Sequence, residues 1–289
     1  MALIFVPTPL GNLGDVTLRS IQALRDADVI VAEDTRVARR LLNALEIGPK
    51  ELWSYREQNA ASVTGGILER AREQRVAVVT DAGMPGISDP GIDLVAAARA
   101  AAVAVEVLPG PSALLGAAVL SGFPLRRFRF EGFPSRTSSA RREEFDSALR
   151  TSLTTVWYES PQRIVAALTD LATVAPDAQV FLVREYTKRF EQQLLGAPAQ
   201  VAAALEAPVR GEIAFVIAPY PSVPAPAHTD IDLDAAIDAR LDAGEHAGDI
   251  ARALAREGAG DRRDLYAKVS ERKAGRGMGR KSAAEDPPS

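Results

Sequence analysis

The amino-acid sequence predicts an α/β protein with two α/β domains and a small helical segment near its C-terminal end. In residues 1–122, short apolar runs alternate with amphipathic stretches, which is typical of βαβ units and a mostly parallel sheet. In residues 123–220, several strand patterns follow one another directly, which indicates a second, mixed sheet. Beyond a proline-rich linker at 221–230, apolar residues recur at helical spacing over 231–272. The basic segment 273–289 is expected to be disordered.

The elements of the first domain follow from apolar runs and from the residues that end them. The continuous apolar run over 3–6 stops at Pro7, which predicts a buried strand. Leu18, Ile21 and Leu24 then recur at helical spacing. By the same reasoning we expect strands at 29–32, 76–79 and 103–107, and helices over 37–45, over 113–120 and from Asp89-Pro90, a common N-cap and first-turn pair.

The second domain is expected to begin near Gly122–Leu125, where the alternating segment 126–133 leaves the first sheet. Strands are expected at 154–158, 179–183, 190–195 and 212–218, and helices over 138–149, 161–173 and 198–206. The C-terminal segment 232–271 is expected to form three short helices that resemble a helix-turn-helix, with the turn at Gly258-Ala259-Gly260.

Two small counts exclude whole classes of chemistry. The chain of 289 residues contains no cysteine, which excludes disulfides, thiolate nucleophiles and cysteine-based metal sites. Its two histidines, His228 and His246, lie near the C-terminal end, so residues 1–227 contain no Ser-His-Asp triad and no histidine metal site. The net charge of −4 argues against a basic nucleic-acid coat, although local basic patches remain possible.

Membrane insertion and export are not expected from this sequence. No apolar run approaches the roughly 20 residues that a membrane-spanning helix needs. The N-terminal string MALIFVPTPLGN lacks both the basic region and the long apolar region of a signal peptide. We therefore expect a cytoplasmic protein.

The candidate functional loops are those that follow the predicted strands, because ligands of open parallel sheets bind beyond the carboxyl ends of the strands. Six such loops are 7–15, 32–36, 80–91, 108–113, 158–161 and 184–188. The loop 80–91 is the richest in glycine, proline and aspartate, and it offers shaped backbone groups rather than a phosphate cradle. The loop 7–15 lacks the GxGxxG pattern of dinucleotide-binding proteins.

Several of these loops also have a purely structural interpretation. Asp34 can cap the helix that follows it, and Glu33 can pair with Arg36. In the same way, Glu185 and Lys188 can form a simple ion pair. The residue types alone do not choose between capping or pairing and ligand binding.

In this order, the loops resemble those of the tetrapyrrole-methylase-like superfamily of S-adenosylmethionine methyltransferases, and most closely its branch of ribosomal RNA small subunit methyltransferase I. The matching strings within residues 3–220 are VPTPLGNLGD, VAEDTR, TDAGMPGISDPG, LPGPSAL, FEGFPSR, WYESPQR, VREYTK and RGEIAFVI. The string over 81–91 is the most specific, although Met84 stands where the family usually has threonine. The segment 246–271 also resembles the small helical domain common in this branch.

The resemblance implies two α/β domains with S-adenosylmethionine held in the cleft between them, and a homodimer. It also implies 2′-O-methylation of a cytidine ribose in the decoding region of 16S rRNA, within the small ribosomal subunit. Carried over by motif, the residues that contact the donor would be Leu10, Asp81, Gly83, Ile87, Ser112, Ala113, Tyr158, Ile213 and Ala214.

The chemistry of such a transfer calls for alignment and modest help from a base, because the methyl group of a sulfonium is already activated. No metal is required by this logic. Since histidine is absent from the loops, the base must be a carboxylate, a neutral lysine or a tyrosine. The candidates in the relevant loops are Glu33, Asp34, Asp89, Glu159, Glu185 and Lys188. We favour Asp34 or Glu185 as the base or hydroxyl orienter. Arg36 and Lys188 are expected to contact phosphate or ribose.

A cluster of arginines in the second domain is the candidate RNA surface. Six arginines are opposed by Glu131 alone: Arg126, Arg127, Arg129, Arg136, Arg141 and Arg142. We interpret them as phosphate contacts, whereas the interleaved Phe128, Phe130 and Phe133 are expected to belong to the core.

Two other functions remain open at this stage. A methyltransferase of tetrapyrrole or corrin precursors has the same fold, and fold alone does not decide function. A non-catalytic RNA-binding protein that retains the cleft is the other alternative, and it would bind the donor without transferring the methyl group.

Overall fold

The computed structural model of the chain describes residues 1–220, 233–256, 259 and 262–279. The chain forms two compact units, Met1–Pro221 and Ser222–Ser289, which we describe separately. The expected linker at 221–230 and the part of the basic segment beyond residue 279 lie outside the described residues. Among the described helices, none is both long and apolar enough to cross a lipid bilayer.

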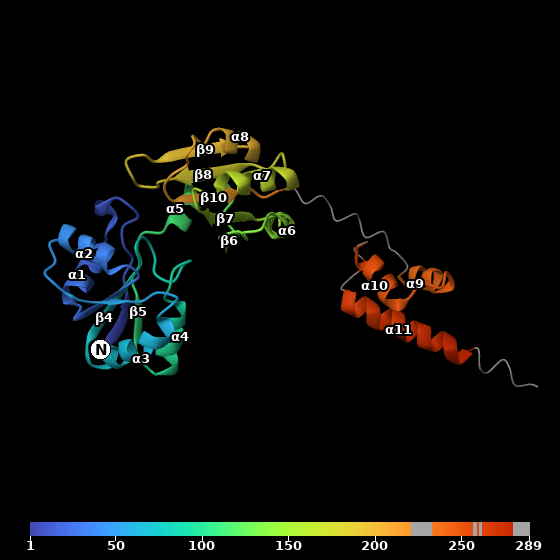
Figure 1. The fold of residues 1–289 in the computed structure, drawn as a ribbon, viewed down its shortest axis with the longest axis horizontal. Helices are drawn as coiled ribbons and strands as arrows, with labels where there is room; N and C mark the ends of the chain where they lie inside the picture. The colour runs from blue at the N-terminus through green and yellow to red at the C-terminus, as the bar shows by residue number, and fades with distance from the viewer. Residues whose placement is uncertain (221–232, 257–258, 260–261, 280–289) are drawn as a thin grey trace, which may run out of the picture. The chain divides into compact units, whose positions relative to one another are not determined.

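The first half of the larger unit is built on a parallel sheet (Figure 1). Its strands are β1 (Ala2–Phe5), β2 (Val29–Ala32), β3 (Glu51–Ser54), β4 (Arg75–Val79) and β5 (Val105–Val107). Their order is β3-β2-β4-β1-β5, and every neighbouring pair is parallel. Strands β2 and β4 are almost completely buried, as expected for a sheet that is covered on both faces.

Two pairs of helices cover this sheet. Helices α1 (Leu18–Asp26) and α2 (Thr35–Ala44) pack on one face, and helices α3 (Ala60–Glu73) and α4 (Ile92–Ala100) pack on the other (Figure 1). A short 3-10 turn, Leu13–Asp15, precedes α1. Strand β3 and helix α3 were not expected, because β3 is short and only partly buried and α3 contains two adjacent glycines, which weaken a helical pattern.

The second half contains the mixed sheet that was expected. Its strands are β6 (Phe128–Gly132), β7 (Thr154–Glu159), β8 (Val180–Arg184), β9 (Gln192–Gly196) and β10 (Ile213–Ile217), in the order β6-β7-β10-β8-β9. Strand β6 pairs with β7 in parallel, and the other neighbours are antiparallel. Strand β10 therefore runs opposite to β7 and β8, so the residues before β10 meet the carboxyl ends of those two strands.

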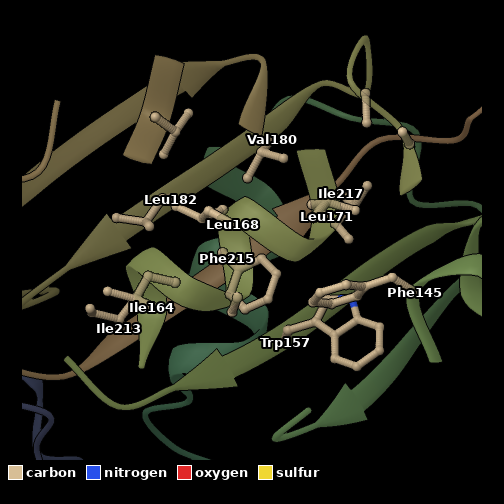
Figure 2. Close-up of a cluster of buried hydrophobic side chains, with 14 of the residues drawn as sticks. Phe145, Trp157, Ile164, Leu168, Leu171, Val180, Leu182, Ile213, Phe215 and Ile217 are labelled. Carbon is tan, nitrogen blue, oxygen red and sulfur yellow. The ribbon is translucent and has the colours of Figure 1, made fainter. Parts of the chain in front are cut away.

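Helices α6 (Ser138–Leu149), α7 (Ile164–Val174) and α8 (Pro198–Ala203) cover one face of this second sheet. The core beneath them contains three packed aromatic rings, shown in Figure 2. Phe145 meets Trp157 edge-on at 5.1 Å between ring centroids, and Trp157 stacks on Phe215 at 6.1 Å. This close packing holds the second sheet rigid, so the loops at its edge start from fixed positions.

Helix α5 (Ala113–Leu120) covers the opposite face of the second sheet. Its Ala117 and Ala118 are completely or almost completely buried against Val156 and Val216. The change of packing partner therefore lies at residues 108–112, before α5, whereas the expected boundary was near Gly122–Leu125. Because the residues of α5 are small and apolar on every side, the sequence does not indicate which of the two sheets this helix covers.

The smaller unit contains three helices among its described residues: α9 (Leu233–Asp242), α10 (Ala247–Arg256) and α11 (Arg262–Gly279). Their shared core includes Ile237, Ile250, Leu254, Leu265 and Val269. Arg272 of α11 donates to Asp238 of α9 at 2.7 Å and pairs with Asp234 at 3.0 Å. Helix α11 continues to Gly279, so the expectation of disorder is wrong for residues 273–279.

Candidate functional site

A cavity of about 350 Å³ lies within the larger unit, where the strand ends of its two halves meet. Loops that follow β1, β4 and β5 contribute one side, and the ends of β7, β8 and β10 contribute the other. Its lining is mostly apolar, with a few polar groups, which is the usual character of a small-molecule site.

Most of the residues expected to contact a donor line this one cavity. They are Leu10, Gly83, Ile87, Ser112, Ala113, Tyr158, Ile213 and Ala214. Asp81 is the exception, since its carboxylate accepts the backbone N–H of Asp34 at 3.2 Å and it does not line the cavity. Met84, which departs from the family pattern, lies in the lining.

The first loops of the cavity are held together by backbone hydrogen bonds. The N–H of Thr8 donates to the carbonyl of Gly83 at 2.9 Å, and the N–H of Gly83 donates back at 3.0 Å. Gly83 adopts a φ of 81°, which favours glycine, and a Cβ there would lie 3.1 Å from Leu10. A larger residue at position 83 would strain the backbone and crowd Leu10, which lines the cavity.

The opposite wall is aromatic. The ring of Tyr158 meets Phe130 edge-on at 5.0 Å and Phe133 at 5.7 Å. Burial, more than the nearby charge of Asp89, raises the pKa of Tyr158 to about 12. Phe128 and Phe130 pack in the core as expected, but Phe133 is 53% exposed at the cavity edge, so the core interpretation is wrong for that residue.

The sequence allows two roles for Asp89, as a helix N-cap and as a candidate base in a functional loop. Helix α4 begins at Ile92 with Gly91 as its N-cap, so the expected capping by Asp89 is wrong. The carboxyl group of Asp89 lines the cavity instead. Burial, followed by the charges of Glu33, Asp81 and Glu212, raises its pKa to about 7. Three acidic residues, Asp89, Glu159 and Glu212, line the cavity, and an ionised carboxylate among them would attract a cationic ligand.

Asp34 caps helix α2, which is the structural alternative to ligand binding. It is the N-cap of α2, and its carboxylate accepts the backbone N–H of Arg36 at 2.8 Å and the Arg36 guanidinium at 2.6 Å. These bonds hold the pKa of Asp34 well below its ordinary range. The pKa of Glu33 is raised, mainly by burial and then by Asp81. Glu33 and Asp34 lie beside the cavity and do not line it.

Glu185, Lys188 and Glu212 form a second polar cluster at the cavity edge. The Nζ of Lys188 donates to Glu185 at 2.9 Å and to Glu212 at 3.0 Å, and the Glu212 backbone N–H donates to the Glu185 carboxylate at 3.0 Å. Burial alone would raise the pKa of Glu185, but these bonds and the Lys188 charge bring it below its ordinary value. Of the three residues, only Glu212 lines the cavity.

Two glycines allow this cluster to form. A Cβ at Gly211, whose φ is 90°, would overlap the Glu185 carboxyl group. A Cβ at Gly11 would overlap the side chain of Lys188. Lys188 thus lies directly over the loop after β1 and links the two halves at the end of the cavity.

Sequence reasoning does not predict Glu212 and Gly211 as site residues, because both precede a strand and the candidate loops follow strands. Strand β10 is antiparallel to its neighbours, so Ile213 pairs with Glu159 of β7 and with Arg184 of β8, at the carboxyl ends of those strands. The signal was available in the string RGEIAFVI, where polar residues directly precede an apolar strand.

The arginine cluster divides into buried and exposed members. Arg141 is buried and pairs with Asp170, so the phosphate-contact interpretation is wrong for it. Arg129 pairs with Glu131 at 2.8 Å. The exposed members of the cluster are Arg126, Arg127, Arg129, Arg136 and Arg142.

Comparison with known proteins assigns the family. The sequence model described as Tetrapyrrole (Corrin/Porphyrin) Methylases matches residues 2–203. The chain belongs to this family. The ribosomal RNA small subunit methyltransferase I of Halalkalibacterium halodurans is 40% identical over 74% of this chain and 75% of that protein. The protein of the same name from Synechocystis is 36% identical over 91% of this chain and 95% of that one. This tetrapyrrole methylase therefore falls in the branch that the sequence strings indicated.

Solved structures agree on the fold. A diphthine synthase superimposes with a TM-score of 0.62 at 16% identity, over 75% of this chain and 90% of that one. Cobalt precorrin-4 methyltransferase gives 0.60 at 18% identity, over 75% and 94%. The predicted fold class, two α/β halves of the tetrapyrrole methylase type with added C-terminal helices, is confirmed.

Proposed function

We propose that this tetrapyrrole methylase transfers a methyl group from S-adenosylmethionine to the 2′-hydroxyl of a cytidine in the decoding region of 16S rRNA. The observation that carries the proposal is the cavity that gathers Leu10, Gly83, Ser112, Tyr158 and Ile213 from loops far apart in sequence. An RNA substrate is supported by the relatives. They are named ribosomal RNA small subunit methyltransferase I, and this chain matches them over most of their length.

The residues of the cavity fit the donor in shape and charge. S-adenosylmethionine carries a sulfonium, an ammonium and one carboxylate, so its net charge is positive. The apolar lining suits its adenine, and the carboxylate of Asp89 suits one of its cationic groups. When bound, the donor supplies an activated methyl group.

The polar cluster at the cavity edge would orient the ribose hydroxyl. Glu212 lines the cavity and its side chain is 69% exposed, so a substrate hydroxyl can reach it. We assign the proton acceptor to Glu212. Glu185 and Lys188 then act as positioning residues, since Lys188 bonds both carboxylates at once. Asp34, which is bonded to Arg36, is a weak base in this arrangement.

Replacement of Glu212 is expected to slow the transfer step. The Glu212→Gln variant keeps the shape of the side chain but loses its charge, so kcat should fall by about 100-fold while the donor Kd changes by much less. Glu206→Gln removes an exposed carboxylate from the segment between α8 and β10, outside the cavity lining, and is the matched control. A normal kcat in Glu212→Gln would remove this residue from the mechanism.

The function is tested by incubating the protein with methyl-labelled S-adenosylmethionine and one of three acceptors. These are intact 30S subunits, naked 16S rRNA and a tetrapyrrole precursor, and the labelled position is then mapped. Label on a cytidine ribose of the decoding region is the expected result. Label in the precursor alone would indicate the alternative enzyme, and donor binding with no transfer would indicate a binding protein.

A further inference from the structure

Helix α2 presents three arginines on one face. Arg36, Arg39 and Arg40 are spaced i, i+3 and i+4, which places them side by side on a helix. The opposite face carries Ala38 and Leu42, which are buried against the first sheet. The helix contains no acidic residue, so its solvent side is purely cationic.

These guanidinium groups are largely free to bind an external ligand. Arg39 and Arg40 are exposed, and among the described residues neither side chain forms a hydrogen bond or an ion pair. Arg36 contacts Asp34, but its side chain remains 79% exposed. Arg56 adds a fourth cation, held in place because its Nε donates to the carbonyl of Glu33 at 2.9 Å.

This cationic face lies beside the mouth of the donor cavity. Helix α2 begins at Asp34, whose backbone N–H donates to Asp81, and Asp81 directly precedes the cavity residues Ala82 and Gly83. Burial raises the pKa of Asp81, and the nearby charges of Arg56 and Arg40 act in the opposite direction. The carboxylates near the face are Glu33, Asp34, Asp81 and the exposed Glu57, and Asp34 is already neutralised by Arg36.

The arginine cluster of the second half is less suitable for this role. Arg141 is buried on Asp170, and Arg142 lies 3.9 Å from the same carboxylate. Arg129 is paired with Glu131. Arg126, Arg127 and Arg136 of that cluster are exposed, but none of them lines the donor cavity. Helix α2 is favoured because its N-cap Asp34 is bonded to Asp81, directly before the cavity residues Ala82 and Gly83, and because it adds the exposed cations Arg39 and Arg40 there.

We infer that the α2 arginine face, formed by Arg36, Arg39, Arg40 and Arg56, binds the phosphates that flank the target nucleotide of the RNA substrate. The inference rests on the proposed function. Phosphate contacts fix the register of the strand without reading its bases, so this face would set RNA affinity and leave the transfer step to the cavity.

The test measures binding of the full-length protein to 16S rRNA between roughly 50 and 200 mM salt, a range over which phosphate contacts make affinity strongly salt-dependent. The Arg39→Gln/Arg40→Gln variant is expected to bind about tenfold more weakly and to lower the slope of log K against log salt by about 0.7 for each lost contact. Its donor Kd should stay unchanged. Arg39→Lys/Arg40→Lys should retain the slope, because charge rather than fork geometry binds the phosphates.

The matched control is Arg72→Gln/Arg99→Gln, which removes two exposed arginines from the last turns of α3 and α4, on the other face of the sheet. It should bind RNA like the wild type. An unchanged affinity and slope in Arg39→Gln/Arg40→Gln would overturn the inference, while methylation by the wild type would leave the proposed function intact. If the wild type neither binds nor methylates the RNA, both fail together.

Discussion

Asp89→Asn is expected to weaken binding of S-adenosylmethionine by about 10- to 100-fold, which corresponds to about 1.5–3 kcal/mol for a lost charge-assisted contact. Asp89 lines the cavity and supplies negative charge to an otherwise mostly apolar site. The amide keeps the shape of the side chain but cannot balance a cation. Titration calorimetry with the donor alone measures the effect without any RNA.

The same residue predicts how donor affinity changes with pH. Because the pKa of Asp89 is raised to about 7, its carboxyl group is largely protonated below that pH and ionised above it. The donor Kd of the wild type should therefore decrease as the pH rises from 6 to 8, roughly one unit on either side of that pKa. In Asp89→Asn this step should be absent.

Stability is expected to change in the opposite direction from affinity. The pKa of Asp89 rises on folding from an ordinary value of 3.8 to about 7, so the folded state binds the proton more tightly. The wild type therefore loses stability as the pH rises across that interval. Asp89→Asn removes this loss and should be more stable above pH 7 by about 1–2 kcal/mol, since the group is only partly buried and solvent screens its charge.

A nearby exposed carboxylate provides the control. Asp93→Asn changes the first turn of α4, which follows Asp89 and lies outside the cavity lining, and it should alter donor affinity little. Equal donor affinities of Asp89→Asn and the wild type at pH 8 would contradict the role assigned to Asp89.

Arg141→Ala is expected to lower the free energy of unfolding by about 3–5 kcal/mol, the usual cost of breaking a buried ion pair from one side. Arg141 donates to Asp170 through Nε at 2.8 Å and through a second, shorter bond, and it also donates to the Ser135 carbonyl at 3.2 Å. Asp170 accepts from Ser138 at 2.7 Å as well. Loss of the guanidinium leaves this carboxylate buried without its cation.

Arg142→Ala is the matched control, because Arg142 is the next residue of α6 and its side chain is 44% exposed. It should change stability by less than about 0.5 kcal/mol. Urea unfolding measures the free energy of unfolding of both variants. The double variant Arg141→Met/Asp170→Leu should recover part of the lost stability, because it leaves no unpaired buried charge. If Arg141→Ala instead unfolds like the wild type and changes the salt dependence of RNA binding, Arg141 is an RNA contact after all.

The sequence by itself determined the layered fold and most of the cavity. Continuous apolar runs such as Val29–Ala32, bounded by polar residues and alternating with amphipathic stretches, predict buried strands between helices. Since parallel strands end at one edge, the loops at Leu10, Gly83 and Ser112 had to meet there. The matching strings then indicated the family that the comparisons show.

Only the tertiary structure decided which polar side chains face the cavity. Asp89 and Asp34 both precede helices, but the first turn of α4 starts at Ile92, which frees Asp89, whereas Asp34 caps α2. Glu212 reaches the site because β10 runs antiparallel to its neighbours. Arg141 and Arg142 are adjacent in sequence, yet one is buried and the other exposed. The type of a residue indicates what its side chain can bind. The direction in which that side chain points depends on the phase of its helix or the orientation of its strand, and long-range packing sets both.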